Sequence, residues 1–151
     1  LGYTYSNNFL QKIGVTKFQR IDAPFVASYI HGAYRIGVLV GLDKEAAEAG
    51  KDVAMQIAAL NPVAVDASSV PADVIAREKD IVMELMKQDP KMAGKPEEML
   101  AKIAEGKMNV FFKEQTLTAQ AFVKDSSKSV GDYLKESGNL TVTDFKRVAL
   151  G

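Results

Sequence analysis

The chain has few side chains that could carry out covalent chemistry. His31 is its only imidazole, and the absence of cysteine among its 151 residues excludes thiol nucleophiles, disulfides and thiolate metal sites. The patterns HExxH, GxSxG, GxxxxGK[ST] and GxGxxG, which accompany zinc hydrolysis, serine acyl transfer and nucleotide binding, do not occur. Glu97 and Glu98 stand at a predicted helix start, where acids complement the helix dipole. The sequence therefore predicts no catalytic residue, no metal site and no cofactor.

His31 nevertheless belongs to a group of residues suited to binding. Tyr29, Gly32, Tyr34 and Arg35 lie beside it in the sequence. As a lone histidine in a turn, His31 could simply be solvated or hydrogen-bonded to its neighbours. Alternatively, a rigid hairpin presents it to a partner, since tyrosine and arginine are enriched among residues that dominate binding energy. The residue types alone leave both interpretations open.

The hydropathy pattern predicts the elements that would position these residues. Residues 17–42 form two extended runs and predict a β-hairpin with His31 at its tip. Asp43 is expected to cap a helix that ends near Leu60. Residues 1–15 predict the end of a helix that begins upstream.

Residues 71–113 predict two antiparallel helices, because a proline precedes each one and a break containing proline and glycine separates them. The apolar residues recur at helical spacing and give each helix a narrow apolar stripe. Two interpretations of the stripe stay open: the helices pack on each other, or the pair presents a surface to a partner or to a second copy of the chain. The residues predicted for this stripe are Val74, Ile81, Leu85, Leu100, Ile103 and Val110.

The C-terminal part predicts an extended segment over 117–123, a helix over 127–136 and a last strand over 140–149. Together with the hairpin over 17–42, this pattern predicts an α+β fold. We expect a small antiparallel sheet flanked by helices, with an antiparallel helical hairpin inserted at 71–113. A chain of this length is able to bury a core of its own.

Charge and hydropathy exclude several classes of partner. The 19 basic and 19 acidic side chains balance, which removes the general electrostatic attraction to nucleic acids and anionic membranes. The apolar runs are a few residues long, against about 18 for a membrane span, and the first residues do not resemble a signal peptide. We therefore expect a cytoplasmic protein that binds neither nucleic acid nor membranes.

Three segments resemble the elongation factor Ts family, the guanine-nucleotide exchange factors of bacterial elongation factor Tu. They are SYIHGAYRIGVLV at 28–40, KDVAMQIAALNPVAV at 51–65 and EGKMNVFFKEQTLTAQAFVKD at 105–125. Their order and spacing, with the predicted helical pair between the second and the third, cover nearly the whole chain. The combination is specific, whereas each segment alone is not.

The resemblance implies a domain organisation. Residues 16–70 and 114–151 would form a C-terminal core subdomain, and residues 71–113 would be the family's dimerisation module. It also implies further domains upstream, including one whose Thr-Asp-Phe loop reaches the magnesium site of elongation factor Tu. Thr143-Asp144-Phe145 repeats this triplet within the last predicted strand. We interpret that match as a coincidence and expect Phe145 in the core.

The resemblance also implies a function without catalytic residues of its own. The chain would bind elongation factor Tu and promote the release of GDP. His31 matches the family's histidine that contacts the GTP-binding domain of that partner, and Tyr29, Gly32, Tyr34 and Arg35 are assigned by their adjacency to it. The alternative function is structural: self-association through the helical pair, without exchange activity.

Overall fold

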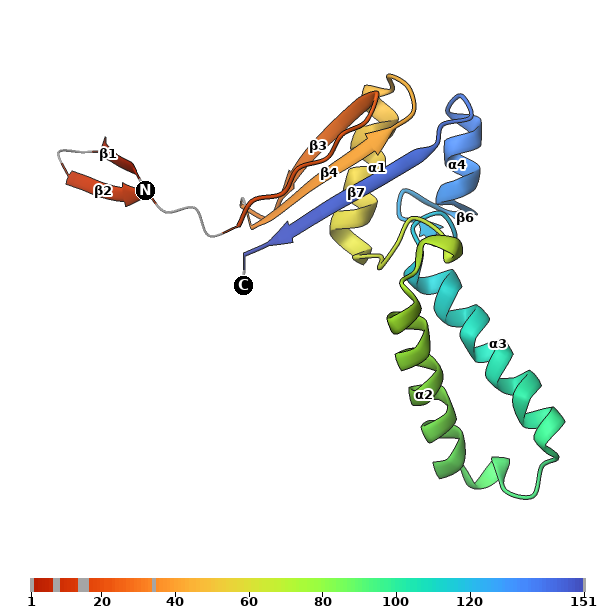
Figure 1. Ribbon diagram of the computed structural model, residues 1–151. Coiled ribbons are helices and arrows are strands. Elements are labelled where there is room, and N and C mark those ends of the chain that lie inside the picture. Colours follow the sequence, from red (N-terminus) through yellow and green to blue (C-terminus); the bar gives the residue numbers. More distant parts are fainter. Residues whose placement is uncertain (1, 7–8, 14–16, 34, 151) are drawn as a thin grey trace.

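The computed structural model describes residues 2–6, 9–13, 17–33 and 35–150. Figure 1 shows a twisted sheet with the helix α1 behind it and α4 near one end, while α2 and α3 extend away from this body as a pair. The predicted α+β fold is confirmed, with four helices and small antiparallel sheets among the described residues.

The main sheet has three antiparallel strands in the order β3-β4-β7. They are β3 (Phe25–His31), β4 (Ile36–Leu42) and β7 (Val142–Ala149). Val38 pairs with Tyr29 of β3 on one side and with Arg147 of β7 on the other. The central strand is rich in β-branched residues, which favour extended backbone. The predicted hairpin and last strand are thus confirmed, with His31 at the end of β3 that adjoins the turn.

The helix α1 (Ala47–Leu60) packs on one face of this sheet. Gly50 lies at the closest approach, because a Cβ atom there would stand 2.6 Å from the Cβ of Ala27. The buried core lies between this helix, the sheet and the C-terminal elements. Its buried residues are Val38, Val40, Leu42, Ala49, Val53, Ala54, Ile57, Ala58, Leu117, Phe122, Val130, Leu134, Leu140 and Val142. Phe145, expected in the core, packs against this cluster and is partly buried.

The predicted cap of α1 is wrong. The helix begins after Ala46, and the Asp43 side chain makes a different contact. Its carboxylate accepts a hydrogen bond from the Thr141 backbone N–H at 2.9 Å, and its own N–H donates to the Thr141 carbonyl at 3.1 Å. This pairing ties the end of β4 to the segment before β7. The Asp43 carboxylate, which the sequence predicts as a helix cap, is therefore occupied by a tertiary contact.

The helix predicted over residues 1–15 is also wrong. The structure has two antiparallel strands there, β1 (Gly2–Ser6) and β2 (Phe9–Ile13). Tyr3, Thr4 and Tyr5 are aromatic and β-branched residues, which favour strands over helices. A helix this short would also be marginal without packing, since its first turn is costly to form.

The helical pair consists of α2 (Ala72–Gln88) and α3 (Glu97–Gln115). Pro71 and Pro96 each precede the first helical residue, where the missing N–H of proline costs no hydrogen bond. A short 3₁₀ turn, Pro90–Met92, lies between the helices. Both predicted helices are therefore confirmed as elements.

The base of the helical pair is held by backbone hydrogen bonds. Ala64 forms a parallel bridge with Thr116. The Leu117 N–H donates to the Ala64 carbonyl at 3.0 Å, and the Thr118 N–H donates to the Val65 carbonyl at 3.0 Å. The two chain segments that enter and leave the pair are therefore joined side by side.

The segment after α3 differs from the prediction of a strand over 117–123. Residues 117–120 form a turn, followed by β5 (Ala121–Phe122) and β6 (Asp125–Ser129). The helix α4 (Val130–Glu136) begins three residues later than predicted, because Ser129 and Asp132 form a reciprocal capping box.

Candidate functional site

The tip of the β3–β4 hairpin places the predicted binding residues together. Tyr29 and His31 lie on the same face of β3, where alternation along the strand directs both side chains. The Tyr29 hydroxyl and His31 Nδ1 share a hydrogen bond of 3.0 Å, and their ring centroids are 5.8 Å apart. Tyr29 is half-buried against the core, whereas His31 is exposed. The tyrosine therefore holds the imidazole at the surface.

The turn itself has an unusual backbone. Gly32 has φ +64° and Ala33 has φ +54°, both in the left-handed region. That conformation suits glycine, but it costs about 1 kcal/mol at an alanine. The Arg35 N–H donates to the Gly32 carbonyl at 3.2 Å and closes the turn. Tyr34, also predicted for the site, lies outside the described residues.

The end of β7 supports this turn. The Leu150 N–H donates to the Arg35 carbonyl at 2.7 Å, and Ile36 pairs with Ala149. Arg35 is exposed beside this contact. The tip is thus anchored on both sides, by the core through Tyr29 and by the last strand through Arg35.

The residues predicted for the apolar stripe do not all lie in the contact between α2 and α3. The pair has its own small core of Val82, Met86 and Met108, against which Leu100 and Ile103 pack. From the apolar pairs Ile81/Val82 and Leu85/Met86 the structure buries the second member. Ile81, Leu85 and Val110 are exposed at 46%, 59% and 53%, and Val74 is half-buried outside this cluster. A helix of 3.6 residues per turn directs adjacent residues about 100° apart, so hydropathy alone does not choose between them.

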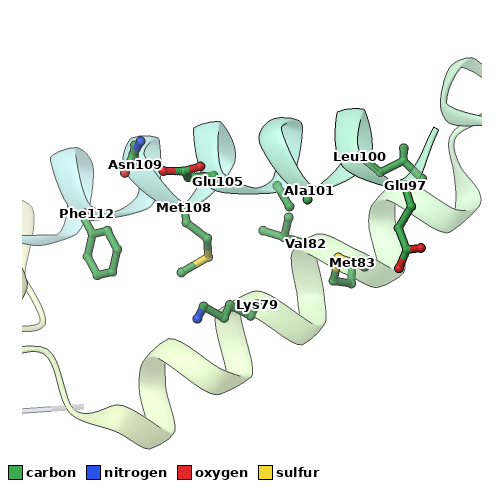
Figure 2. Close-up of a pocket in the computed structure, with 11 residues that line it drawn as sticks. Lys79, Val82, Met83, Glu97, Leu100, Ala101, Glu105, Met108, Asn109 and Phe112 are labelled. Atoms are coloured by element: carbon green, nitrogen blue, oxygen red, sulfur yellow. The ribbon is translucent and has the colours of Figure 1, made fainter. Parts of the chain in front are cut away.

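A hollow of about 540 Å³ remains between the two helices. Figure 2 shows Val82, Met108 and Phe112 directed into the space between α2 and α3. The charged side chains that line the hollow are Lys79, Glu97 and Glu105. The two helices therefore leave a partly open groove between them.

A buried carboxylate joins three elements of the core, and sequence analysis missed it. Asp52 of α1 accepts hydrogen bonds from Lys124 at 2.5 Å and from the Tyr133 hydroxyl at 2.6 Å. Burial and the Asp52 carboxylate raise the pKa of Tyr133 to about 12, and the hydrogen bond to Asp52 raises the pKa of Lys124. This cluster connects α1 to the β5–β6 turn and to α4.

A second polar link in the core uses amides. Gln56, which is fully buried, donates to the Ala121 carbonyl at 3.0 Å and to Gln120 Oε1 at 3.3 Å, and accepts from the Val123 N–H at 2.8 Å. Gln120 donates in turn to the Glu114 carbonyl at 2.9 Å, in the last turn of α3. In the sequence, these two polar links could have been recognised from Asp52 and Gln56, which lie one helical turn apart among the apolar residues of α1.

The described residues contain neither a cluster of metal ligands nor a membrane-spanning helix. Residues 2–6, 9–13, 17–33 and 35–150 contain no group of three or more histidine, aspartate or glutamate side chains able to hold a metal ion. Among the helices of that same part of the chain, none has the length and apolar character required to cross a membrane.

Comparison with known proteins identifies the family of this chain. The family model described as Elongation factor TS matches residues 5–151. The chain belongs to the elongation factor Ts family. Among its relatives, elongation factor Ts of Christiangramia forsetii is 47% identical over 145 residues, and that of Thermobifida fusca is 42% identical over 146. Elongation factor Ts of a Hydrogenobaculum species is 48% identical over 124 residues.

These alignments cover most of this chain but only part of each relative. They include 93% of the chain and 52% of the Christiangramia protein, 93% and 51% for Thermobifida, and 82% and 44% for Hydrogenobaculum. The chain therefore spans about half the length of the elongation factor Ts proteins that it matches. Membership of this family places the chain among translation elongation factors.

Proposed function

We propose that this chain binds elongation factor Tu and promotes the release of GDP from it, acting in the cytoplasm by binding and not by covalent chemistry. Membership of the elongation factor Ts family over residues 5–151 carries this proposal. In it, residues 16–70 and 114–151 form the core subdomain that meets the partner, and residues 71–113 form a dimerisation module. Neither nucleic acid nor a membrane is among its partners.

The proposed mechanism is thermodynamic coupling. A protein that binds the nucleotide-free form of a G protein more tightly than the GDP-bound form must weaken GDP binding by the same factor. Reversing a 1:99 distribution between the two forms requires about 5.5 kcal/mol of differential affinity. A broad contact surface has to supply this free energy, so the hairpin tip is one part of a larger interface.

The geometry of the tip supports its role as a contact. Tyr29 engages Nδ1 of the imidazole, so Nε2 is the ring nitrogen through which His31 would meet the partner. The hydrogen bond from Leu150 to Arg35 holds the turn in place before binding. A contact that is ordered in advance loses less conformational entropy when the complex forms.

The experiment compares His31→Ala with Lys44→Ala. Lys44 is exposed in the turn at the other end of β4 and serves as the matched control. The assay follows the release of fluorescent GDP from elongation factor Tu. We expect His31→Ala to raise the concentration of this chain that gives half-maximal release about tenfold, equivalent to about 1.4 kcal/mol. Equal half-saturation concentrations for the wild type and both variants would mean that His31 is not part of the interface. If the wild-type chain neither binds elongation factor Tu nor accelerates release, the proposed function itself fails.

Self-association is the alternative function, and in it the exposed apolar residues Ile81, Leu85 and Val110 of the helical pair would form the contact between copies. Sedimentation equilibrium at several concentrations, with and without elongation factor Tu, separates the two proposals, because a module that only self-associates does not bind the added partner. A self-association module forms dimers that Leu85→Lys disrupts, whether or not elongation factor Tu is added. An exchange factor binds elongation factor Tu, and Leu85→Lys leaves that binding intact.

A further inference from the structure

Methionine is concentrated in the helical pair. Five of the six methionines of the chain lie between residues 83 and 108. Met86 and Met108 are 4% and 6% exposed and belong to the small core between α2 and α3. Thioether side chains are flexible and polarisable, so they fill irregular spaces, but oxidation converts them into polar sulfoxides. The packing of this pair therefore depends on residues that an oxidant can change chemically.

Four of these five methionines form two groups by exposure, and the fifth, Met92, is half-buried. Met83 is 45% exposed and Met99 is 46% exposed, so an oxidant in solution reaches both side chains. Burial protects the sulfur atoms of Met86 and Met108. The first oxidation of the pair is therefore expected at Met83 and Met99.

Met83 differs from Met99 in what surrounds it. Met83 lines the hollow of about 540 Å³ with Val82, Leu100 and Met108, and it lines a second hollow of about 130 Å³ with Met86 and Leu100. Met99 is absent from the described residues that line either hollow. Met83 thus combines access to solvent with a place in the lining of both hollows, beside residues of the small core.

We propose that Met83 is a site of reversible oxidation to methionine sulfoxide by hydrogen peroxide, and that this sulfoxide loosens the contact between α2 and α3. The sulfur lone pair attacks one peroxide oxygen and the O–O bond breaks. The sulfur is oxidised by two electrons and gains one oxygen atom, while the remaining oxygen leaves as water after proton transfer. The product places a strong hydrogen-bond acceptor beside apolar side chains, where it is costly unless water enters.

The test uses the whole 151-residue chain. Hydrogen peroxide is added in steps, sulfoxide at each methionine is quantified by peptide mass spectrometry, and amide hydrogen exchange is followed in α2 and α3. Once Met83 is fully oxidised, we expect exchange in peptides containing Val82 and Leu100 to become about fivefold faster, with peptides of α1 unchanged. Methionine sulfoxide reductases should restore the original rates.

Two variants make the test specific. Met83→Leu keeps an apolar side chain of similar volume that peroxide does not oxidise, and it should keep slow exchange after treatment. Met99→Leu is the matched control, because it removes an equally exposed thioether outside the hollows, and it should respond to peroxide as the wild type does. Full sulfoxide at Met83 without faster exchange would overturn the proposal. Equal loosening of Met83→Leu and the wild type would also overturn it.

Discussion

Gln56 connects α1 to the C-terminal part of the core, and its removal should destabilise the protein. In Gln56→Leu, three hydrogen bonds disappear, and Gln120 Oε1, the Ala121 carbonyl and the Val123 N–H lose their partner. Each bond contributes about 1 kcal/mol, and burying an apolar side chain in place of an amide returns about 1 kcal/mol. The expected net loss is therefore about 2 kcal/mol, or about 4–8 °C in Tm for a chain of this size.

The measurement is urea unfolding followed by circular dichroism, because the chain has no tryptophan for fluorescence. Gln88→Leu is the control, since Gln88 is an exposed glutamine of α2 whose side chain donates to Glu84 at 3.3 Å. It should change the free energy of unfolding by less than about 0.5 kcal/mol. A loss below about 0.5 kcal/mol for Gln56→Leu would refute the idea that these bonds stabilise the core.

A charged variant separates hydrogen bonding from packing at the same position. In Gln56→Glu, the ionised carboxylate can still accept from the Val123 N–H, but it faces the Ala121 carbonyl without a proton to donate. A protonated carboxyl restores one donor. Relative to the wild type at each pH, this variant should therefore recover stability as the pH falls from 7 to about 5. A difference that does not change with pH would mean that the donor to Ala121 is unimportant.

Two further changes test the packing and the electrostatics of the core. Gly50→Ala should lower the free energy of unfolding by about 1–3 kcal/mol, since its Cβ would stand 2.6 Å from that of Ala27. In contrast, Gly106→Ala in α3 should be neutral or stabilising by about 0.5–1 kcal/mol, because an added Cβ there meets nothing within 4 Å beyond its chain neighbours and the backbone of its own helix. Equal urea midpoints for the two variants would argue against close packing of α1 on β3. Because the folded-state pKa of Tyr133 is raised to about 12 from an ordinary value of 10.0, its contribution is complete below pH 10 and is lost as the pH rises toward 12. Alkaline unfolding of Tyr133→Phe should therefore depend less on pH over that interval, and an unchanged profile would contradict the role of this hydroxyl.

Local sequence patterns were sufficient to predict the elements that hold the candidate site. The hairpin of β3 and β4 was predictable, although β3 begins at Phe25 and not near residue 17, because β-branched and aromatic residues flank a turn that contains glycine. The same pattern placed His31 at the tip. The helices of the pair were predictable from proline positions and helical spacing. These features depend on residues close together in the sequence.

The errors at Asp43 and in the choice of buried residues on α2 arose where distant residues decide the structure. Asp43 does not cap α1 because Thr141 binds its carboxylate, and nothing near residue 43 indicates that contact. The choice of Val82 and Met86 over Ile81 and Leu85 depends on where α3 lies. The support that Leu150 gives to Arg35 joins residues that are far apart in the chain, so it too required the structure.

The parallel bridge between Ala64 and Thr116 limits how the helical pair can change in length. The two bridged segments run in the same direction, so the chain that leaves the first must return to the beginning of the second. A connection of this kind requires about a dozen residues or more. The pair can therefore shorten toward that minimum, or lengthen by whole turns at its far end, without moving either bridged residue, whereas a tight turn could not replace it.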